Sequence, residues 1–276
     1  MPELPELEVV CEVLNRRVAG QIIERVEVLP PGGAIVVRDL TQLGLDAALR
    51  GARIAEVTRR GKFLRFAVVD NPLWLVVNPK LTGRLQLAAA GDRRYAKTAL
   101  VLVLADGQEL RYVDQKTMGQ IYLAELLDDV PGYAGMGPEA LAISLAGFKE
   151  RLRPFRGEIK GILVRSEFVA GIGNAYADEI LWAARLHPYR KRTQLTADEV
   201  ERLYSAMRTT LLDATEQVRA EMGDNIYLKP RDFLNIHMKT GEACPRCGGP
   251  ITLVGANQRI TNFCRTCQPG GLIKGM

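Results

Sequence analysis

The hydrophobic pattern changes its period near the middle of the chain, and this change constrains the fold more than any other feature. Residues 1–132 contain short apolar runs of strand length, whereas the chain beyond residues 128–138 follows a helical spacing. Strand-rich and helix-rich segments bury their apolar faces in different ways, so the pattern predicts an α+β protein with separate domains. A chain of 276 residues is long enough for two such domains, each with its own core.

Residues 1–132 predict an antiparallel β-sandwich with one flanking helix. The helix is indicated over residues 5–17, where apolar residues recur at helical spacing and Pro5 suits the first turn. Asp106-Gly107 is a two-residue hairpin signal between two apolar runs. The predicted strands are residues 21–29, 53–69, 73–77, 84–88, 99–105, 109–113 and 120–123. No helical pattern alternates with these strands, which favours antiparallel sheets.

The segment at residues 128–138 is rich in Gly and Pro and predicts a linker. Helical spacing follows, first around residues 145–152 and then around residues 159–169. Thr196 with Glu199 forms a capping box that begins a further helix running to about Met222. Residues 223–240 show no clear period and predict a loop. The predicted domains are therefore a sandwich at 1–132, a helical domain at 133–240 and a cysteine-bearing domain at 241–276.

The net charge of +5 is unevenly distributed. Residues 1–132 hold 17 basic and 17 acidic groups, whereas residues 133–276 hold 20 basic and 15 acidic groups. This asymmetry fits a nucleic acid or another anionic partner, and charge alone fits a slightly basic solvated face equally well. The sequence shows no membrane-spanning run and no secretory signal, so we expect a cytoplasmic or nucleoid protein.

Two cysteine pairs predict a zinc ribbon near the end of the chain. Cys244 and Cys247 are separated by sixteen residues from Cys264 and Cys267, and both pairs have the C-x2-C spacing. Four thiolates fill a tetrahedral shell and leave no open position for a reacting ligand. We therefore expect one structural Zn²⁺; two disulfides are the alternative reading of the same cysteines.

Two further segments suit phosphate binding. Gly171 and Gly173 precede Asn174 at the entrance of an apolar helix, where exposed amides and the helix dipole attract anions. Arg259 stands among hydrogen-bonding residues just before the second cysteine pair. An ordinary glycine-containing turn and a solvated hairpin tip remain alternatives for these two segments.

The first residues suggest an amine nucleophile. Removal of Met1 would make Pro2 a free secondary amine, which attacks a sugar C1′ to form an iminium. Glu3 and Glu6 lie in the same turn and are candidates for proton transfer, although acidic residues also simply favour the start of a helix.

Together these motifs resemble those of bacterial formamidopyrimidine-DNA glycosylases and their endonuclease VIII relatives. The matching stretches are MPELPE, Gly61-Lys62, Thr82-Gly83, GIGNAYADEILW and CRTCQPG, so the resemblance covers nearly the whole chain. It implies a β-sandwich, a helix-two-turn-helix domain and a zinc finger. It also implies a monomer that binds double-stranded DNA, excises oxidised bases and cleaves the strand at the resulting abasic site.

The resemblance also implies roles for individual residues. Pro2 matches the nucleophile, Glu3 the acid that assists opening of the sugar ring, and Glu6 another site carboxylate. Lys62 matches a lysine near the lesion phosphates. The matches to further DNA contacts are Lys160, Asn174 and Arg259.

Two motifs depart from the family pattern. His-Leu-Gly-Met is replaced by residues 78–81, and Asp-Pro-Arg-Arg-Phe-Gly by residues 114–119. Leu81, Lys116 and Met118 would then fill the gap left by a flipped base. We expect a preference for oxidised purines; oxidised pyrimidines, or a catalytically weak damage-binding protein, are the alternatives.

Overall fold

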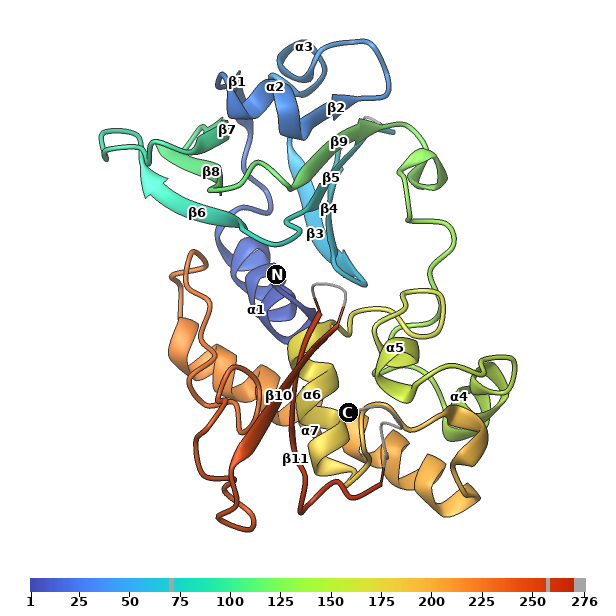
Figure 1. Cartoon of the computed structure of the whole chain (residues 1–276). Coiled ribbons are helices and arrows are strands. Elements are labelled where there is room, and N and C mark those ends of the chain that lie inside the picture. Colours follow the sequence, from blue (N-terminus) through green and yellow to red (C-terminus); the bar gives the residue numbers. More distant parts are fainter. Residues whose placement is uncertain (70–71, 257–258, 271–276) are drawn as a thin grey trace. The chain divides into compact units, whose positions relative to one another are not determined.

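The computed structural model describes residues 1–69, 72–256 and 259–270 (Figure 1). The chain divides into two compact units. Unit 1 comprises Met1–Gly135 and Val218–Pro230, and unit 2 comprises Met136–Gln217 and Arg231–Met276.

Unit 1 contains two β-sheets, which confirm the predicted sandwich of mainly antiparallel strands. The four-stranded sheet has the order β1-β7-β8-β6 and consists of β1 (Ile23–Val28), β6 (Gly83–Ala89), β7 (Thr98–Leu104) and β8 (Gln108–Asp114). The five-stranded sheet has the order β2-β9-β5-β4-β3 and consists of β2 (Val37–Asp39), β3 (Ile54–Arg60), β4 (Phe63–Val68), β5 (Trp74–Asn78) and β9 (Gln120–Ala124). The pairing of β2 with β9 is parallel, and β2 is a three-residue edge strand that the apolar pattern did not predict. Short helices α2 (Gly32–Val36) and α3 (Leu45–Leu49) connect strands, and η1 (Leu127–Asp129) follows β9.

Helix α1 (Leu4–Arg17) is the predicted flanking helix and begins one residue earlier than expected. Glu3 and Glu6 form a capping box at its start. The helix is fastened to β3 through Val57, whose N–H donates to Asn15 Oδ1 at 2.9 Å. The Cys11 thiol donates to the carbonyl of Val57. Burial raises the pKa of Cys11 to about 11. This thiol therefore stays protonated and belongs to the core.

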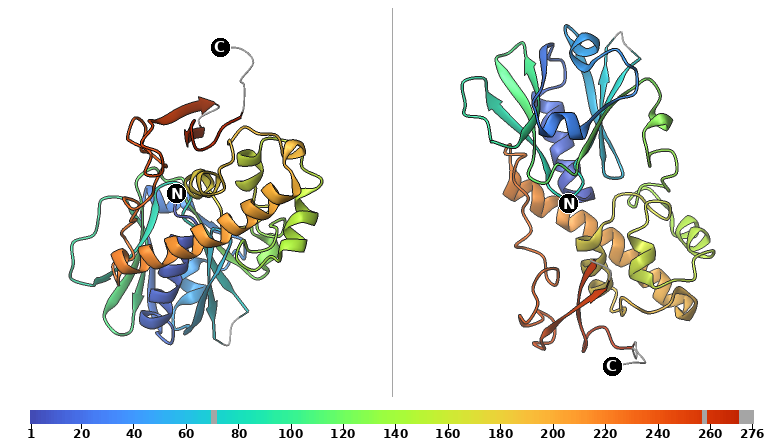
Figure 2. Two further views of the ribbon diagram at one scale, coloured as in Figure 1. Left: turned by 90° about the horizontal axis from the view of Figure 1, so that it is seen from below. Right: turned by 45° about the horizontal axis from the view of Figure 1, so that its top comes forward.

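Unit 2 is helical apart from one hairpin. Its elements are α4 (Leu145–Leu152), α5 (Ile159–Leu163), α6 (Asn174–Ala183), η2 (Arg192–Gln194), α7 (Ala197–Met222), β10 (Ile251–Ala256) and β11 (Arg259–Cys264). The predicted capping box of α7 is present, because Thr196 and Glu199 exchange hydrogen bonds of 2.9 and 3.2 Å. Figure 2 shows α7 as the long orange helix, whose residues from Val218 onward belong to unit 1.

The helical spacing over residues 159–169 predicted too long a helix. Helix α5 ends at Leu163, and Phe168 instead packs edge-on against Phe148 and Phe155. The apolar spacing in this stretch therefore reflects a core contact after a turn. Within the described ranges of the chain, the structure contains no helix with the length and hydropathy needed to cross a bilayer.

Gly83 and Gly119 leave space in unit 1 for the buried side chain of Tyr112. Tyr112 is 1% exposed, and a Cβ on Gly119 would lie 1.6 Å from its hydroxyl oxygen. A Cβ on Gly83 would lie 2.1 Å from the same atom. No side chain larger than hydrogen fits at either position unless Tyr112 moves.

We expect Gly119→Ala to lower the free energy of unfolding by about 1–3 kcal/mol, because the added methyl group overpacks this contact. Gly91→Ala is the matched control, since a Cβ there meets open space. Thermal or urea unfolding measures both variants. Equal stability of Gly119→Ala and the unmodified chain would show that Tyr112 has room to move.

Candidate functional site

Pro2 lies in the wall of a small cavity within unit 1. Helix α1 contributes Glu6 to this wall, the segment between β5 and β6 contributes Pro79, and the start of β6 contributes Gly83. The remaining lining residues are Leu7, Val10, Leu64, Arg84, Leu85, Met222, Ile226, Leu228 and Lys229. Pro2 therefore borders a largely apolar space that also contains a carboxylate and two basic side chains.

The two predicted carboxylates beside Pro2 are both buried. Glu3 is 2% and Glu6 is 1% exposed. The N–H of Glu3 donates to Glu6 Oε2 at 2.8 Å, and this bond is part of the cap of α1. The cap thus fixes both carboxylates next to Pro2. The two roles that the sequence offers for them, helix capping and proton transfer, are therefore compatible.

Lys62 lies in the turn between β3 and β4 and is half-buried. Arg59 braces this turn by donating to the Gly61 carbonyl at 3.0 Å and to Glu8 of α1 at 2.6 Å. Lys62 is not among the residues that line the Pro2 cavity. The structure therefore assigns Glu6, but not Lys62, to the same cavity as Pro2.

The three predicted gap-filling residues lie on two loops of unit 1. Leu81, on the loop between β5 and β6, is 44% exposed, and Met118, on the loop between β8 and β9, is 50% exposed. Lys116 is exposed on the second loop. Large apolar side chains left in solvent on neighbouring turns suit insertion between bases.

Asp114 joins these two loops and was not singled out from the sequence. Its Oδ1 accepts hydrogen bonds from the Thr82 hydroxyl and from the N–H of Lys116, while Oδ2 accepts the N–H of Gly119 at 2.7 Å. The Tyr112 hydroxyl also donates to Asp114 Oδ2, at 3.4 Å. The carboxylate is fully buried, so these donors fix the loops that present the exposed side chains.

In unit 2, two predicted DNA contacts converge on one backbone group of the hairpin. Lys160 Nζ and Asn174 Nδ2 both donate to the Ile260 carbonyl, at 2.9 and 2.6 Å. Lys160 is 5% exposed, and its ammonium also forms a 2.6 Å ion pair with Asp178. Its charge is thus taken up inside the unit, which favours a positioning role over contact with phosphate. Arg259 is the first residue of β11, and the neighbouring residues 257–258 lie outside the described residues.

Two acidic residues of α6 hold the hairpin region to the helices. Asp178 accepts from the N–H of Asn262 at 3.3 Å and contacts His237 Nδ1 at 2.8 Å. Glu179 accepts three consecutive N–H groups, those of residues 235–237, at 2.8 to 2.9 Å. Asp178 and Glu179 stand as a charged pair in the apolar run AYADEILW. This pattern could have indicated a structural role from the sequence alone, because buried charges need partners.

The four predicted zinc ligands lie together. Their sulfur atoms are all within 4.8 Å of one another, and Cys247 and Cys264 are separated by 3.4 Å. Tetrahedral Zn–S bonds of about 2.3 Å separate sulfurs by about 3.8 Å, so the four atoms fit one ion. Trp182 Nε1 donates to Cys244 Sγ at 3.4 Å, a contact that stabilises a thiolate. The residues therefore fit one structural Zn²⁺ with a complete protein shell.

Three family models match successive parts of the chain. The formamidopyrimidine-DNA glycosylase N-terminal domain matches residues 1–121, and the H2TH domain of the same family matches residues 135–224. The zinc finger found in FPG and IleRS matches residues 241–270.

Curated relatives match over almost the full chain. A formamidopyrimidine-DNA glycosylase of Symbiobacterium thermophilum is 39% identical, over 98% of this chain and 90% of its own length. One of Thermus thermophilus is 35% identical, over 98% of this chain and its whole length.

Solved structures agree with these matches. A complex of Lactococcus lactis FPG (MutM) with a FAPY-dG containing DNA has a TM-score of 0.86 and 31% identity, covering 97% of this chain and all of the other. A complex of the LlFpg protein with a THF-DNA and an inhibitor has the same score and identity over 98% of this chain and all of that one.

We expect Asp114→Asn to lower the free energy of unfolding by about 1–3 kcal/mol, because an amide group would face N–H and O–H donors in a buried site. Asp106→Asn is the control: Asp106 Oδ1 accepts the Gln108 N–H at an exposed turn, where an amide oxygen serves equally well. Thermal unfolding measures both. A larger loss for Asp106→Asn would contradict the role assigned to Asp114.

Removal of zinc is expected to loosen the hairpin and weaken DNA binding, because thiolate coordination supplies its folding energy. Cys244→Ser should have the same effect. Cys11→Ser is the matched control and should leave the zinc content unchanged. Metal analysis and DNA titration provide the measurements; unchanged DNA affinity in the metal-free protein would separate the hairpin from the binding surface.

Proposed function

Because this chain belongs to the formamidopyrimidine-DNA glycosylase family, we propose that Pro2 is the nucleophile with which it attacks damaged DNA. The enzyme is a DNA glycosylase that excises oxidised purines, and lyase activity at abasic sites is typical of its family. The observation that supports the proposed nucleophile best is the position of Pro2 in the wall of a cavity beside buried Glu6.

The proposed reaction begins when Met1 is removed and Pro2 becomes a secondary amine. An α-amino group has a pKa of about 8, so a sizeable fraction is neutral and nucleophilic near pH 7. Its nitrogen attacks C1′ of the nucleotide, and the glycosidic bond breaks as the base leaves with the bonding electron pair. The proline nitrogen loses its proton and the departing base gains one, so the step balances. Glu3 gives a proton to the sugar ring oxygen, the ring opens, and a C1′ iminium forms.

The iminium makes the rest of the reaction possible. It acidifies the C2′ proton, and loss of that proton expels the 3′ phosphate by β-elimination. A second elimination then expels the 5′ phosphate. In each elimination a base takes a proton from carbon, and the phosphate leaves with the electron pair of its C–O bond, so that carboxylates near Pro2 are suitable proton acceptors.

The DNA-facing residues are proposed from the two units separately. In unit 1, Leu81 and Met118 fill the space of the flipped base, while Lys116 contacts the orphaned base and Lys62 a phosphate. In unit 2, Asn174 and Arg259 contact phosphates. Lys160 contributes by holding β11, as its hydrogen bond to the Ile260 carbonyl supports. The excess of basic over acidic residues in 133–276 supports association of the protein with the nucleoid.

Borohydride reduction in the presence of abasic DNA is expected to give a covalent adduct, and peptide mapping is expected to place it on Pro2. An extra N-terminal residue converts the amine to an amide and should abolish trapping. Pro2→Gly keeps a primary amine and should retain part of the lyase activity. Glu3→Gln should impair base excision more than cleavage of a preformed abasic site.

A different adduct position would overturn this assignment. An adduct on Lys62 or Lys229, with full activity in an N-terminally blocked protein, would transfer the nucleophile to a lysine. The DNA glycosylase activity itself would be unaffected by that result.

A further inference from the structure

One wall of the Pro2 cavity comes from a segment far from Pro2 in sequence. Residues 222–229, called the wall segment below, belong to unit 1 and contribute Met222, Ile226, Leu228 and Lys229 to the cavity lining. The shape of the space beside Pro2 therefore depends on what holds this segment in place.

The start of the wall segment is tied to α1 by ion pairs. Arg219 donates two hydrogen bonds to Glu12, at 2.8 and 2.7 Å, and Asp224 pairs with Arg16 and Arg17. Hydrogen bonding from Arg219 lowers the pKa of Glu12. The side chains are about half exposed, and exposed pairs of this kind add little stability. These contacts alone do not fix the end of the segment that approaches Pro2.

The far half of the wall segment rests on an aromatic contact. Tyr227 stacks on Tyr95, with ring centroids 4.9 Å apart and an interplanar angle of 21°. Tyr227 stands between Ile226 and Leu228, both of which line the cavity. The stack therefore acts directly at the part of the segment that borders Pro2.

Tyr95 lies on the loop of residues 90–97 between β6 and β7, and a fully buried arginine holds this loop. Arg111 is 0% exposed, and its Nη2 donates to the carbonyls of Ala89 and Asp92 at 3.1 and 2.9 Å. The Thr98 hydroxyl donates to the Tyr95 carbonyl at 2.8 Å. These bonds fix the loop backbone on both sides of the tyrosine ring.

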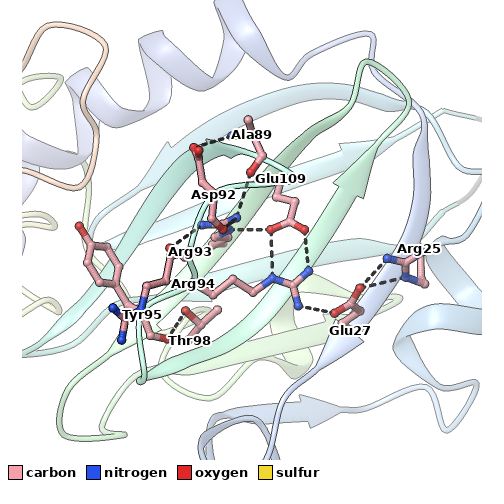
Figure 3. Close-up of polar contacts among 10 residues, drawn as sticks. Arg25, Glu27, Ala89, Asp92, Arg93, Arg94, Tyr95, Thr98 and Glu109 are labelled. Atoms are coloured by element: carbon pink, nitrogen blue, oxygen red, sulfur yellow. Dashed lines mark hydrogen bonds and ion pairs between the residues drawn. The ribbon is translucent and has the colours of Figure 1, made fainter.

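A chain of charges links Arg111 to this loop, and Figure 3 shows its labelled members Glu109, Arg94 and Glu27. Glu109 accepts from Arg111 Nε at 2.6 Å and from Arg94 Nε at 3.1 Å, and Arg94 also bonds Glu27 of β1 at 2.6 Å. Burial opposes ionisation of Glu109, but hydrogen bonds from Arg94 and Arg111 outweigh it and lower its pKa. The loop that presents Tyr95 is thus a rigid support, although it has no regular secondary structure.

We propose that Tyr95 is a positioning residue for base excision: its ring holds Tyr227, and with it the wall segment, in the conformation that encloses a flipped base beside Pro2. The inference rests on the proposed function of Pro2. A nucleotide that has already lost its base has nothing to enclose, so cleavage of a preformed abasic site does not require the stack.

The test compares Tyr95→Ala with Tyr95→Phe, because phenylalanine keeps the ring and removes only the hydroxyl. Single-turnover rates are measured on a duplex with one defined oxidised purine and on the same duplex with a preformed abasic site. Tyr95→Ala should slow excision about 3- to 10-fold and change abasic-site cleavage less than about twofold. Tyr95→Phe should match the unmodified enzyme in both assays.

Two further measurements separate the stack from a general loss of structure. Amide hydrogen exchange should become faster in residues 224–229 of Tyr95→Ala and stay unchanged in α1. In a double-mutant cycle on the excision rate, Tyr95→Ala and Tyr227→Ala should be coupled by a factor of about 2 to 12, which corresponds to about 0.5–1.5 kcal/mol.

Several results would overturn the proposal. Equal slowing of both reactions, an effect of Tyr95→Phe as large as that of Tyr95→Ala, additive single effects, or unchanged exchange in the wall segment would each exclude the positioning role. Failure of the proposed function is recognised separately, because the unmodified enzyme would then form no borohydride adduct at Pro2.

Discussion

Burial of helix α1 is the constraint on which the proposed chemistry depends. Chain termini are usually poorly ordered, and a nucleophile at residue 2 needs a fixed position. Here the apolar face of α1 is buried from its first residue, Leu4, and Asn15 bonds the backbone of β3 at the other end. Pro2 directly precedes the capping box of this helix. The sandwich thus holds in place the end that carries the proposed nucleophile, which would otherwise fray.

Helix α6 has a comparable role in unit 2. Asp178 and Glu179 are both buried, and each would be costly without its partners. Lys160 satisfies the first, and three backbone N–H groups satisfy the second. The same helix places Trp182 on Cys244. Metal coordination therefore shapes the hairpin internally, while α6 determines where the hairpin lies on the helical unit.

Features that depend on neighbours in sequence could be predicted from the sequence. The capping box of Thr196 and Glu199, the clustering of the four cysteines and, to within one residue, the start of α1 all follow from spacing within a few residues or from one coordination shell. The fold class followed from the period of the apolar residues, because that period reflects which face is buried.

The remaining features depend on contacts between distant residues. Nothing near Lys160 in sequence indicates that Asp178 and the Ile260 carbonyl hold its ammonium. Residues 223–240 have no period because polar and aromatic contacts, such as that of Tyr227 with Tyr95, fix the first part of this loop. A pattern of apolar residues contains no information about such pairs.

The discontinuity of unit 1 has a consequence for synthesis of the protein. Domains generally fold as units while the chain emerges, starting from the N-terminus. The sheets and α1 come from residues 1–135, whereas one wall of the Pro2 cavity comes from Met222 to Lys229, a segment that is synthesised after most of unit 2. Until residues 218–230 have been synthesised, the cavity beside Pro2 lacks this wall. A nascent or truncated chain that lacks residues 218–230 would contain Pro2 without the enclosure beside it.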